Sequence, residues 1–306
     1  MGLDIKIVAG SLYIKSIDFC GLFVRSPSGN FMFGCASAHW RVSAQSRERI
    51  KGRVALVHDG ELLWQRQLER PSDCAVSDTG HTIVSDWGFE PIPRGTFYAF
   101  DPEGKVVVQH DVSAHLHTAG ITIKGTLAWC TTALSENAEY NNKLLVFSLS
   151  SGQLLLKTIR PPWEWEIQRV EVVGHNIQVT TSGALYMYDQ SGVLLNEWEV
   201  TKALFQHDKI YGVLRNAEER TSLCPPERMP QEEIETLLAA LQRVSSADDD
   251  VSGYWKAKAQ RKAGEISLAC GENNNALAHF RKALGFDPKV GVAKLVRKLE
   301  RELGPA

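Results

Sequence analysis

The chain has 306 residues, of which 43% are hydrophobic and 23% are charged, and its formal net charge at pH 7 is −2. This length favours two domains over one small core, and the near-neutral charge argues against bulk electrostatic attraction to nucleic acid or membranes. No apolar run reaches about 18 residues, so no membrane-spanning segment is expected, and the first residues lack the pattern of a secretory signal.

The six cysteines form no C-x-x-C pair, and four of them lie inside apolar runs. A free thiol in such a run behaves as a small hydrophobic side chain. We therefore expect a reducing, cytoplasmic location and no metal held by these thiols.

Residues 1–220 repeat one short pattern, which is an apolar run, a turn residue and a second apolar run. The turns of five copies contain Gly10, Gly60, Gly104, Gly152 and Gly192. The turns of a second set, which alternates with the first, contain Gly29, Gly80, Gly125, Gly174 and Asp208. Gly, Asn and Asp supply the positive φ that tight hairpin turns need. Strand-turn-strand repeats with a period of about 40–50 residues are typical of propellers and arrays.

Ten such hairpins predict twenty strands, which group in fours into a five-bladed β-propeller. The chain opens on an outer hairpin and its repeats end on an inner one. We therefore predict that residues 3–17 complete the last blade beside residues 203–215. Such a closure would hide the sheet edges that otherwise invite aggregation.

Three of the copies carry a resemblance to known families. Residues 60–64, 101–108 and 189–195 make the chain resemble WD40-like and quinoprotein-like β-propellers, although the Trp-Asp dipeptide of WD40 repeats is absent. The resemblance implies a mainly β domain that forms a ring of blades. It implies no quinone cofactor, because the metal ligands of the quinoprotein enzymes have no counterpart in this sequence.

Four long connections should gather on one face of the propeller, and they are rich in Trp, Tyr and Arg. They span residues 37–51, 86–94, 134–142 and 161–165. These residue types dominate binding hot spots, so we predict a surface that binds a partner protein. Its predicted residues are Trp40, Arg41, Trp87, Phe89, Arg94, Tyr140, Trp163 and Trp165. The alternative is that these aromatic side chains plug the ring or pack beneath the helices.

Six acidic and histidine side chains should lie near the mouth of the channel: Asp18, Asp73, His115, His117, Glu164 and Glu166. The arrangement resembles that of five-bladed glycosidases, in which carboxylates around the channel act as acid and base. These residues differ in their offsets from the turns, however, and no family motif surrounds them. The motifs of nucleotide-binding proteins, serine hydrolases and zinc proteases are also missing. We therefore expect no catalytic residues, no cofactor and no metal site, with a carbohydrate-binding or glycosidase-like propeller as the alternative.

The composition changes after residue 216. Residues 217–230 contain adjacent prolines and no periodicity, which is typical of a linker. Apolar residues at helical spacing then predict an amphipathic helix over residues 231–245. We therefore divide the chain into a propeller (1–216), a linker (217–230) and a helical domain (231–306).

A frame over residues 257–290 resembles a tetratricopeptide repeat, a pair of antiparallel helices. The residues at the repeat's intervals are Gly264, Gly271, Ala276, Phe280, Ala283 and Pro288. Small residues let the two helices approach closely while Phe280 fills the gap between them. Gln260 and Ser267 stand where bulky residues are usual, which predicts that a neighbour covers that groove. Residues 289–303 should form a capping helix, because one repeat cannot bury its own faces.

The helical end is basic, since residues 252–306 contain eleven Lys or Arg and five Asp or Glu. Such a surface favours an acidic partner or an acidic neighbouring domain. Binding of nucleic acid by the same surface is an alternative. Together these features predict a non-enzymatic two-domain adaptor, a scaffold that binds partner proteins through its propeller loops and its helices.

Overall fold

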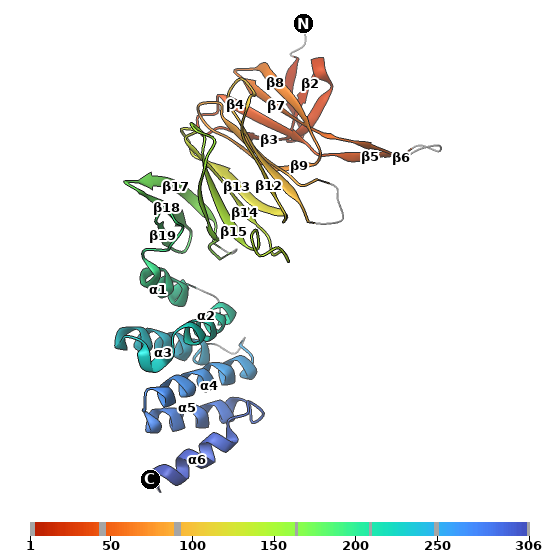
Figure 1. The fold of residues 1–306 in the computed structure, drawn as a ribbon. Helices are drawn as coiled ribbons and strands as arrows, with labels where there is room; N and C mark the ends of the chain where they lie inside the picture. The colour runs from red at the N-terminus through yellow and green to blue at the C-terminus, as the bar shows by residue number, and fades with distance from the viewer. Residues whose placement is uncertain are drawn as a thin grey trace. The chain divides into compact units, whose positions relative to one another are not determined.

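The computed structural model describes residues 4–42, 47–88, 93–162, 165–207, 210–247 and 251–304. The chain separates into two compact units, Met1–Leu195 and Asn196–Ala306. The first unit holds the strands and we call it the β unit, and the second holds the long helices and we call it the helical unit (Figure 1).

The first sheet of the β unit has six antiparallel strands in the order β1-β2-β3-β4-β7-β8. They are β1 (Ile5–Val8), β2 (Ser11–Ile14), β3 (Phe19–Arg25), β4 (Phe31–Ala36), β7 (Gly52–His58) and β8 (Glu61–Leu68). A 3-10 turn, Lys15–Ile17, joins β2 to β3. Between β4 and β7 the chain forms a separate two-stranded ribbon of β5 (His39–Val42) and β6 (Arg47–Ile50). This ribbon stands where the sequence predicted only a long connection.

Three further antiparallel sheets follow in chain order. The second contains β9 (Pro71–Val76), β10 (Thr82–Asp86), β11 (Gly95–Phe100) and β12 (Val106–Val112). The third contains β13 (Leu116–Ile121), β14 (Leu127–Thr132), β15 (Lys143–Ser148) and β16 (Leu154–Ile159). The fourth contains β17 (Ile167–Val173), β18 (Asn176–Thr181) and β19 (Leu185–Tyr188), with one further bridge between Tyr188 and Leu194. The predicted grouping of strands in fours thus holds for the second and third sheets.

The glycine turns that define this grouping are confirmed. Each predicted turn glycine has a φ between 63° and 85°, in the left-handed region that a residue with a Cβ adopts only with strain. They are Gly10, Gly29, Gly60, Gly80, Gly104, Gly125, Gly152, Gly174 and Gly192.

The predicted closure of a fifth blade is wrong. Residues 203–207 and 210–215 are not strands, because they fall in α1 (Glu197–His207) and α2 (Ile210–Leu223). Residues 5–14 instead extend the first sheet, where β2 pairs with β3. The first sheet and the last sheet lie at opposite ends of the β unit (Figure 1).

The N-terminal hairpin shares an apolar cluster with the other strands of the first sheet. Leu12, Ile14 and Phe19 are fully buried against Ala55 and Val57 of β7. Gly34 of β4 makes room for them, because a Cβ there would lie 2.7 Å from Cε1 of Phe19. The hairpin is therefore held in the first sheet by buried apolar side chains as well as by its pairing with β3.

Apolar side chains also fill the spaces between neighbouring sheets. Phe33 and Leu56 of the first sheet share a core with Val84 and Phe100 of the second. Between the second and third sheets, Phe97 and Phe147 stack with their ring centroids 5.3 Å apart. Since side chains alternate along a strand, these sheets bury apolar residues on both faces.

The helical unit continues with a 3-10 turn (Pro226–Arg228), α3 (Gln231–Ser245), α4 (Gly253–Ala269), α5 (Asn273–Phe286) and α6 (Ala293–Leu303). The predicted helix over 231–245 is confirmed. The first part of the predicted linker (217–230) is helical instead, because α2 continues to Leu223. Among the described residues no helix is long and apolar enough to cross a bilayer.

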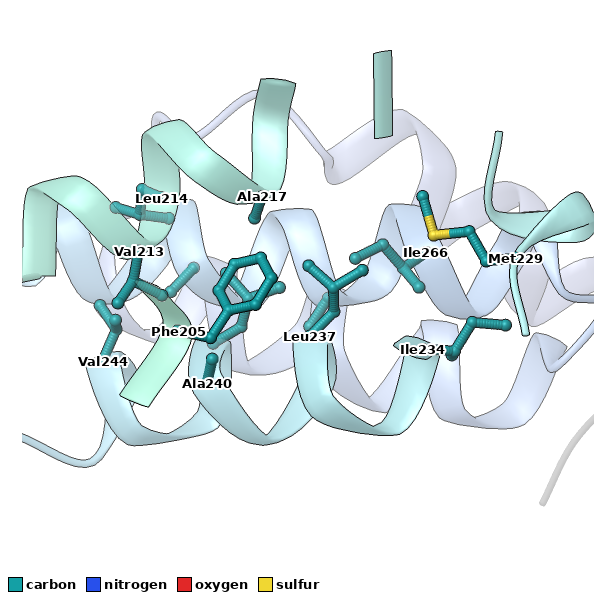
Figure 2. Packing of buried hydrophobic residues seen from close by; sticks show 13 residues of the cluster. Phe205, Val213, Leu214, Ala217, Met229, Ile234, Leu237, Ala240, Val244 and Ile266 are labelled. Carbon is teal, nitrogen blue, oxygen red and sulfur yellow. The ribbon is translucent and has the colours of Figure 1, made fainter. Parts of the chain in front are cut away.

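The helices stack in chain order. Figure 2 shows Phe205 of α1 and Val213 and Leu214 of α2 in one apolar cluster with side chains of α3 and α4. The α3 and α4 residues include Leu237, Ala240 and Ile266. A second core joins α4, α5 and α6 around the fully buried Phe280. Each helix thus packs mainly against its neighbours along the chain, as in helical repeat proteins.

The predicted helix pair over 257–290 is present as α4 and α5. A Cβ at Gly264 would lie 2.5 Å from Cε1 of Phe280, so the glycine makes room for the ring. Gln260 is buried, and its Nε2 donates to Oγ of Ser245 in α3 at 2.6 Å. Gln260, which stands where tetratricopeptide repeats usually have a bulky residue, is therefore covered by the neighbouring helix α3. The sequence predicted that a neighbour would cover this position.

Candidate functional site: a pocket between the inner strands

The first strands of the second, third and fourth sheets converge on one pocket. The backbone N–H of Ala119 in β13 donates to Oδ2 of Asp73 in β9 at 2.9 Å, which joins two of these sheets. The pocket has a volume of about 330 Å³. We call it the inner-strand pocket, and its principal lining side chains are Asp73, His117, Trp129, Arg160, Trp165 and Glu166.

Two indole rings form walls of the inner-strand pocket, and each is held by a glycine. Trp129 and Trp165 are both 8% exposed. A Cβ at Gly120 would lie 2.1 Å from Cζ2 of Trp129, and a Cβ at Gly183 would lie 2.2 Å from Cε2 of Trp165. Since real Cβ atoms do not approach so closely, both rings need a glycine beneath them.

The acidic groups of the pocket sit near the starts of the inner strands, whereas Arg160 directly follows β16. Partial burial raises the pKa of the Asp73 carboxyl, while the hydrogen bond from Ala119 and the nearby His117 act to lower this pKa. Glu166 directly precedes β17, and its backbone N–H donates to Oγ of Ser182 at 3.2 Å. Arg160 donates from Nε to Oδ1 of Asn142.

A β-bulge shapes the pocket at His117. The β13–β14 register shifts between Leu116 and Ala119, and the hydroxyls of Thr118 and Thr131 lie 2.7 Å apart across the bulge. Bulges of this kind redirect side chains and are common beside functional sites. Acceptor carboxylates that share a pocket with indole rings suit a ligand that carries hydrogen-bond donors.

The structure brings together only part of the predicted channel residues. Asp73, His117 and Glu166 line the inner-strand pocket, but Asp18 and His115 do not. The Asp18 carbonyl accepts a hydrogen bond from Arg53, and the His115 ring lies 5.7 Å from Trp87. Glu164 lies outside the described residues. Within the described ranges no group of three or more His, Cys, Asp or Glu side chains lies close enough to hold a metal.

The predicted partner-binding residues are distributed over several places. Trp40 and Arg41 lie in β5, opposite Arg49 and Glu48 of β6. Arg94 is exposed, just before β11. Phe89 and Trp163 lie outside the described residues.

Trp87 and Tyr140 pack against the core between the second and third sheets. The guanidinium of Arg70 lies 5.6 Å from the Trp87 ring, and the Tyr140 hydroxyl lies 3.4 Å from Nε2 of His110. These contacts show that both side chains take part in packing between two sheets, which is neither the ring plug nor the place beneath the helices that the alternative described. Of the partner-binding residues predicted from the sequence, Trp165 lines the inner-strand pocket.

Sequence reasoning missed Trp129 and Arg160. A usable signal for Trp129 existed, because the hairpin turn at Gly125 places Gly120 directly opposite Trp129. A glycine opposite a tryptophan on an antiparallel pair indicates a ring that lies across the neighbouring strand. Arg160 gave no such signal, since its position depends on the distant Asn142.

Replacing Gly183 with alanine should displace Trp165 and destabilise the β unit by about 2 kcal/mol, because the added methyl overlaps the indole. Chemical denaturation followed by tryptophan fluorescence measures this change. Gly285→Ala is the control, since no atom lies within 4 Å of a Cβ at that helical glycine. The control should be neutral or slightly stabilising, and equal losses in both variants would contradict the packing of Trp165 on Gly183.

No family model and no curated protein matches the sequence. Among solved structures, the chain is similar to the β-propeller domain of Cps50 (Swd1) from Myceliophteria thermophila. The similarity has 11% identity and a TM-score of 0.29, and it covers 61% of this chain and 77% of that one. The strand pairing of this chain itself shows successive antiparallel sheets, which are followed by stacked helices.

Proposed function

We propose that this protein is a non-enzymatic interaction scaffold whose helical unit binds an acidic segment of a partner protein. The observation that supports the proposal is the basic side of α4 within a stack of helices, on which Arg261 is exposed and Lys258 is partly exposed. Stacked helical hairpins bury a shared core and leave long outer surfaces, which such proteins use to bind polypeptides.

The α4–α5 pair resembles a tetratricopeptide repeat in its spacing and in its packing of Gly264 on Phe280. A tetratricopeptide module would bind a peptide or helix of a partner, which agrees with the scaffold function. α3 and α6 cover the two sides of this pair, so the repeat does not stand alone.

The partner's chemistry follows from the exposed side chains of α4. Tyr254 is 49% exposed, and the Lys258 ammonium lies 4.9 Å from its ring centroid. Arg261 is exposed one turn further along, and both Arg261 and the partly exposed Lys262 pair with Glu265. Together with the excess of Lys and Arg over residues 252–306, this arrangement favours a partner segment that carries Asp and Glu.

The β unit would contribute a second contact surface. Its loop residues predicted from the sequence remain part of the proposal, with Arg94 exposed and Trp165 at the inner-strand pocket. Binding through loops on a rigid sheet scaffold is a common arrangement.

The test uses the full chain and fluorescent 15-residue peptides in which every second residue is Glu. A matched peptide with Gln in place of Glu is the neutral comparison. Fluorescence anisotropy should show binding of the acidic peptide, and Lys258→Glu with Lys262→Glu should weaken it by about tenfold or more. The matched control is Lys105→Glu with Lys124→Glu in two turns of the β unit, which should leave the affinity unchanged.

Equal affinity for the acidic and neutral peptides would contradict the proposal. A single-stranded oligonucleotide tests the nucleic-acid alternative in the same assay. That alternative predicts oligonucleotide binding that falls steeply with salt concentration, whereas the proposal predicts no such binding.

A further inference from the structure

We propose that the inner-strand pocket binds the guanidinium group of an arginine side chain on a partner protein. The assignment rests on the proposed scaffold function, because it names the partner chemistry of the β unit. It concerns different residues from those of α4, so the two proposals can fail separately.

The charge of the inner-strand pocket favours a cation. Asp73 and Glu166 contribute two carboxylates against the single guanidinium of Arg160, which donates to the neutral amide of Asn142. Oδ2 of Asp73 accepts the N–H of Ala119. A carboxylate offers about four acceptor positions, so this one retains capacity for donors that enter the pocket.

Desolvation adds to this preference. The largest influence on the pKa of the Asp73 carboxyl is burial, which raises it. The hydrogen bond and the charges around Asp73 therefore do not fully replace the water that its carboxylate loses on burial. An arriving cation would supply that compensation.

The walls select a flat cation. Trp129 and Trp165 both line the pocket, and Gly120 and Gly183 fix the positions of their rings. A guanidinium can lie over an indole face while its N–H groups donate in its own plane to a carboxylate. An ammonium group is not planar, so it cannot lie flat over an indole ring as a guanidinium can. A neutral ligand has no charge that the two carboxylates would attract.

The volume of about 330 Å³ lies at the lower end of the range for small-ligand sites. It suits one inserted side chain. The rest of the partner would then contact the surface around the pocket.

The experiment titrates the full chain with Nα-acetyl-arginine methylamide by isothermal titration calorimetry. The corresponding citrulline compound, which is neutral and nearly the same shape, the lysine compound and glucose are titrated in parallel. We expect arginine to bind with a dissociation constant on the order of millimolar. Lysine should bind more weakly, and citrulline and glucose should not bind measurably.

Asp73→Asn and Glu166→Gln should each weaken arginine binding by about threefold to tenfold. Both replacements keep the shape of the side chain, and Glu166 is exposed, so its variant serves if Asp73→Asn alters folding. The control is Asp59→Asn, which changes the same charge at an exposed turn of the first sheet.

Equal binding of arginine and citrulline would overturn the proposal, and so would the absence of arginine binding. If glucose binds and Asp73→Asn abolishes that binding, the pocket is a carbohydrate site and the guanidinium proposal is wrong. Lys258→Glu with Lys262→Glu should leave arginine binding intact, which separates a failure of this assignment from a failure of the helical surface.

Discussion

Replacing Phe280 with alanine is expected to destabilise the helical unit by about 3–5 kcal/mol, a far larger effect than that of a surface substitution. Phe280 is fully buried between α4 and α6, and its ring lies against Gly264. The smaller side chain would leave a cavity that the rigid helix pair can fill only in part. Urea denaturation followed by far-UV circular dichroism at 222 nm measures the loss.

Phe286 provides the matched control on the same helix. It is 41% exposed, so Phe286→Ala should cost less than about 1 kcal/mol. A loss at Phe286 equal to that at Phe280 would contradict the α4–α5–α6 core.

Replacing Glu233 with alanine is expected to destabilise the helical unit by about 3 kcal/mol, because it breaks a buried ion pair. Glu233 is 3% exposed and accepts hydrogen bonds from the guanidinium of Arg220, one of them at 3.3 Å to Oε2. The pair joins α2 to α3, and Glu197 of α1 pairs with the same guanidinium at 3.1 Å. In the variant, the positive charge of the partly buried Arg220 would have one carboxylate fewer to offset its loss of hydration.

The neighbouring residue Glu232 is the control. It pairs with Lys202 at the surface, and exposed pairs contribute little to stability, so Glu232→Ala should cost less than about 1 kcal/mol. Thermal unfolding monitored by circular dichroism compares the two variants. A similar melting temperature for both would contradict the inter-helix role of Glu233.

Turn chemistry explains why most of the β unit could be predicted from the sequence. Each glycine turn forces a reversal at a fixed place, and the apolar runs on either side then form the paired strands. The structure confirms this from Gly10 to Gly192. The helix pair around Gly264 and Phe280 was predictable for a similar reason, since a small residue opposite a large one specifies close packing.

The error after Leu195 has an equally local cause. The tenth predicted turn, at Asp208, was the one without glycine, and short apolar runs beside it fit a strand or a helix equally well. The structure resolves this ambiguity through tertiary packing. Phe205, Val213, Leu214 and Ala217 are buried on α3 and α4 as parts of helices (Figure 2).

The candidate site could be predicted only in part. Asp73, His117 and Glu166 share a place at the starts of inner strands, and the hairpin pattern alone indicated that. Which of the loop aromatic residues face a pocket depends on packing between sheets. Trp87 and Tyr140 pack against a core, whereas Trp165 lies over Gly183, in the turn between β18 and β19.

Hydrogen–deuterium exchange of the full chain, with and without the alternating-Glu peptide, tests the scaffold function most directly. The proposal predicts that the bound peptide slows exchange in α4, in the segment that contains Tyr254, Lys258 and Arg261. It predicts unchanged exchange in the four sheets of the β unit. Slower exchange confined to the β unit, or no change anywhere at a saturating peptide concentration, would contradict it.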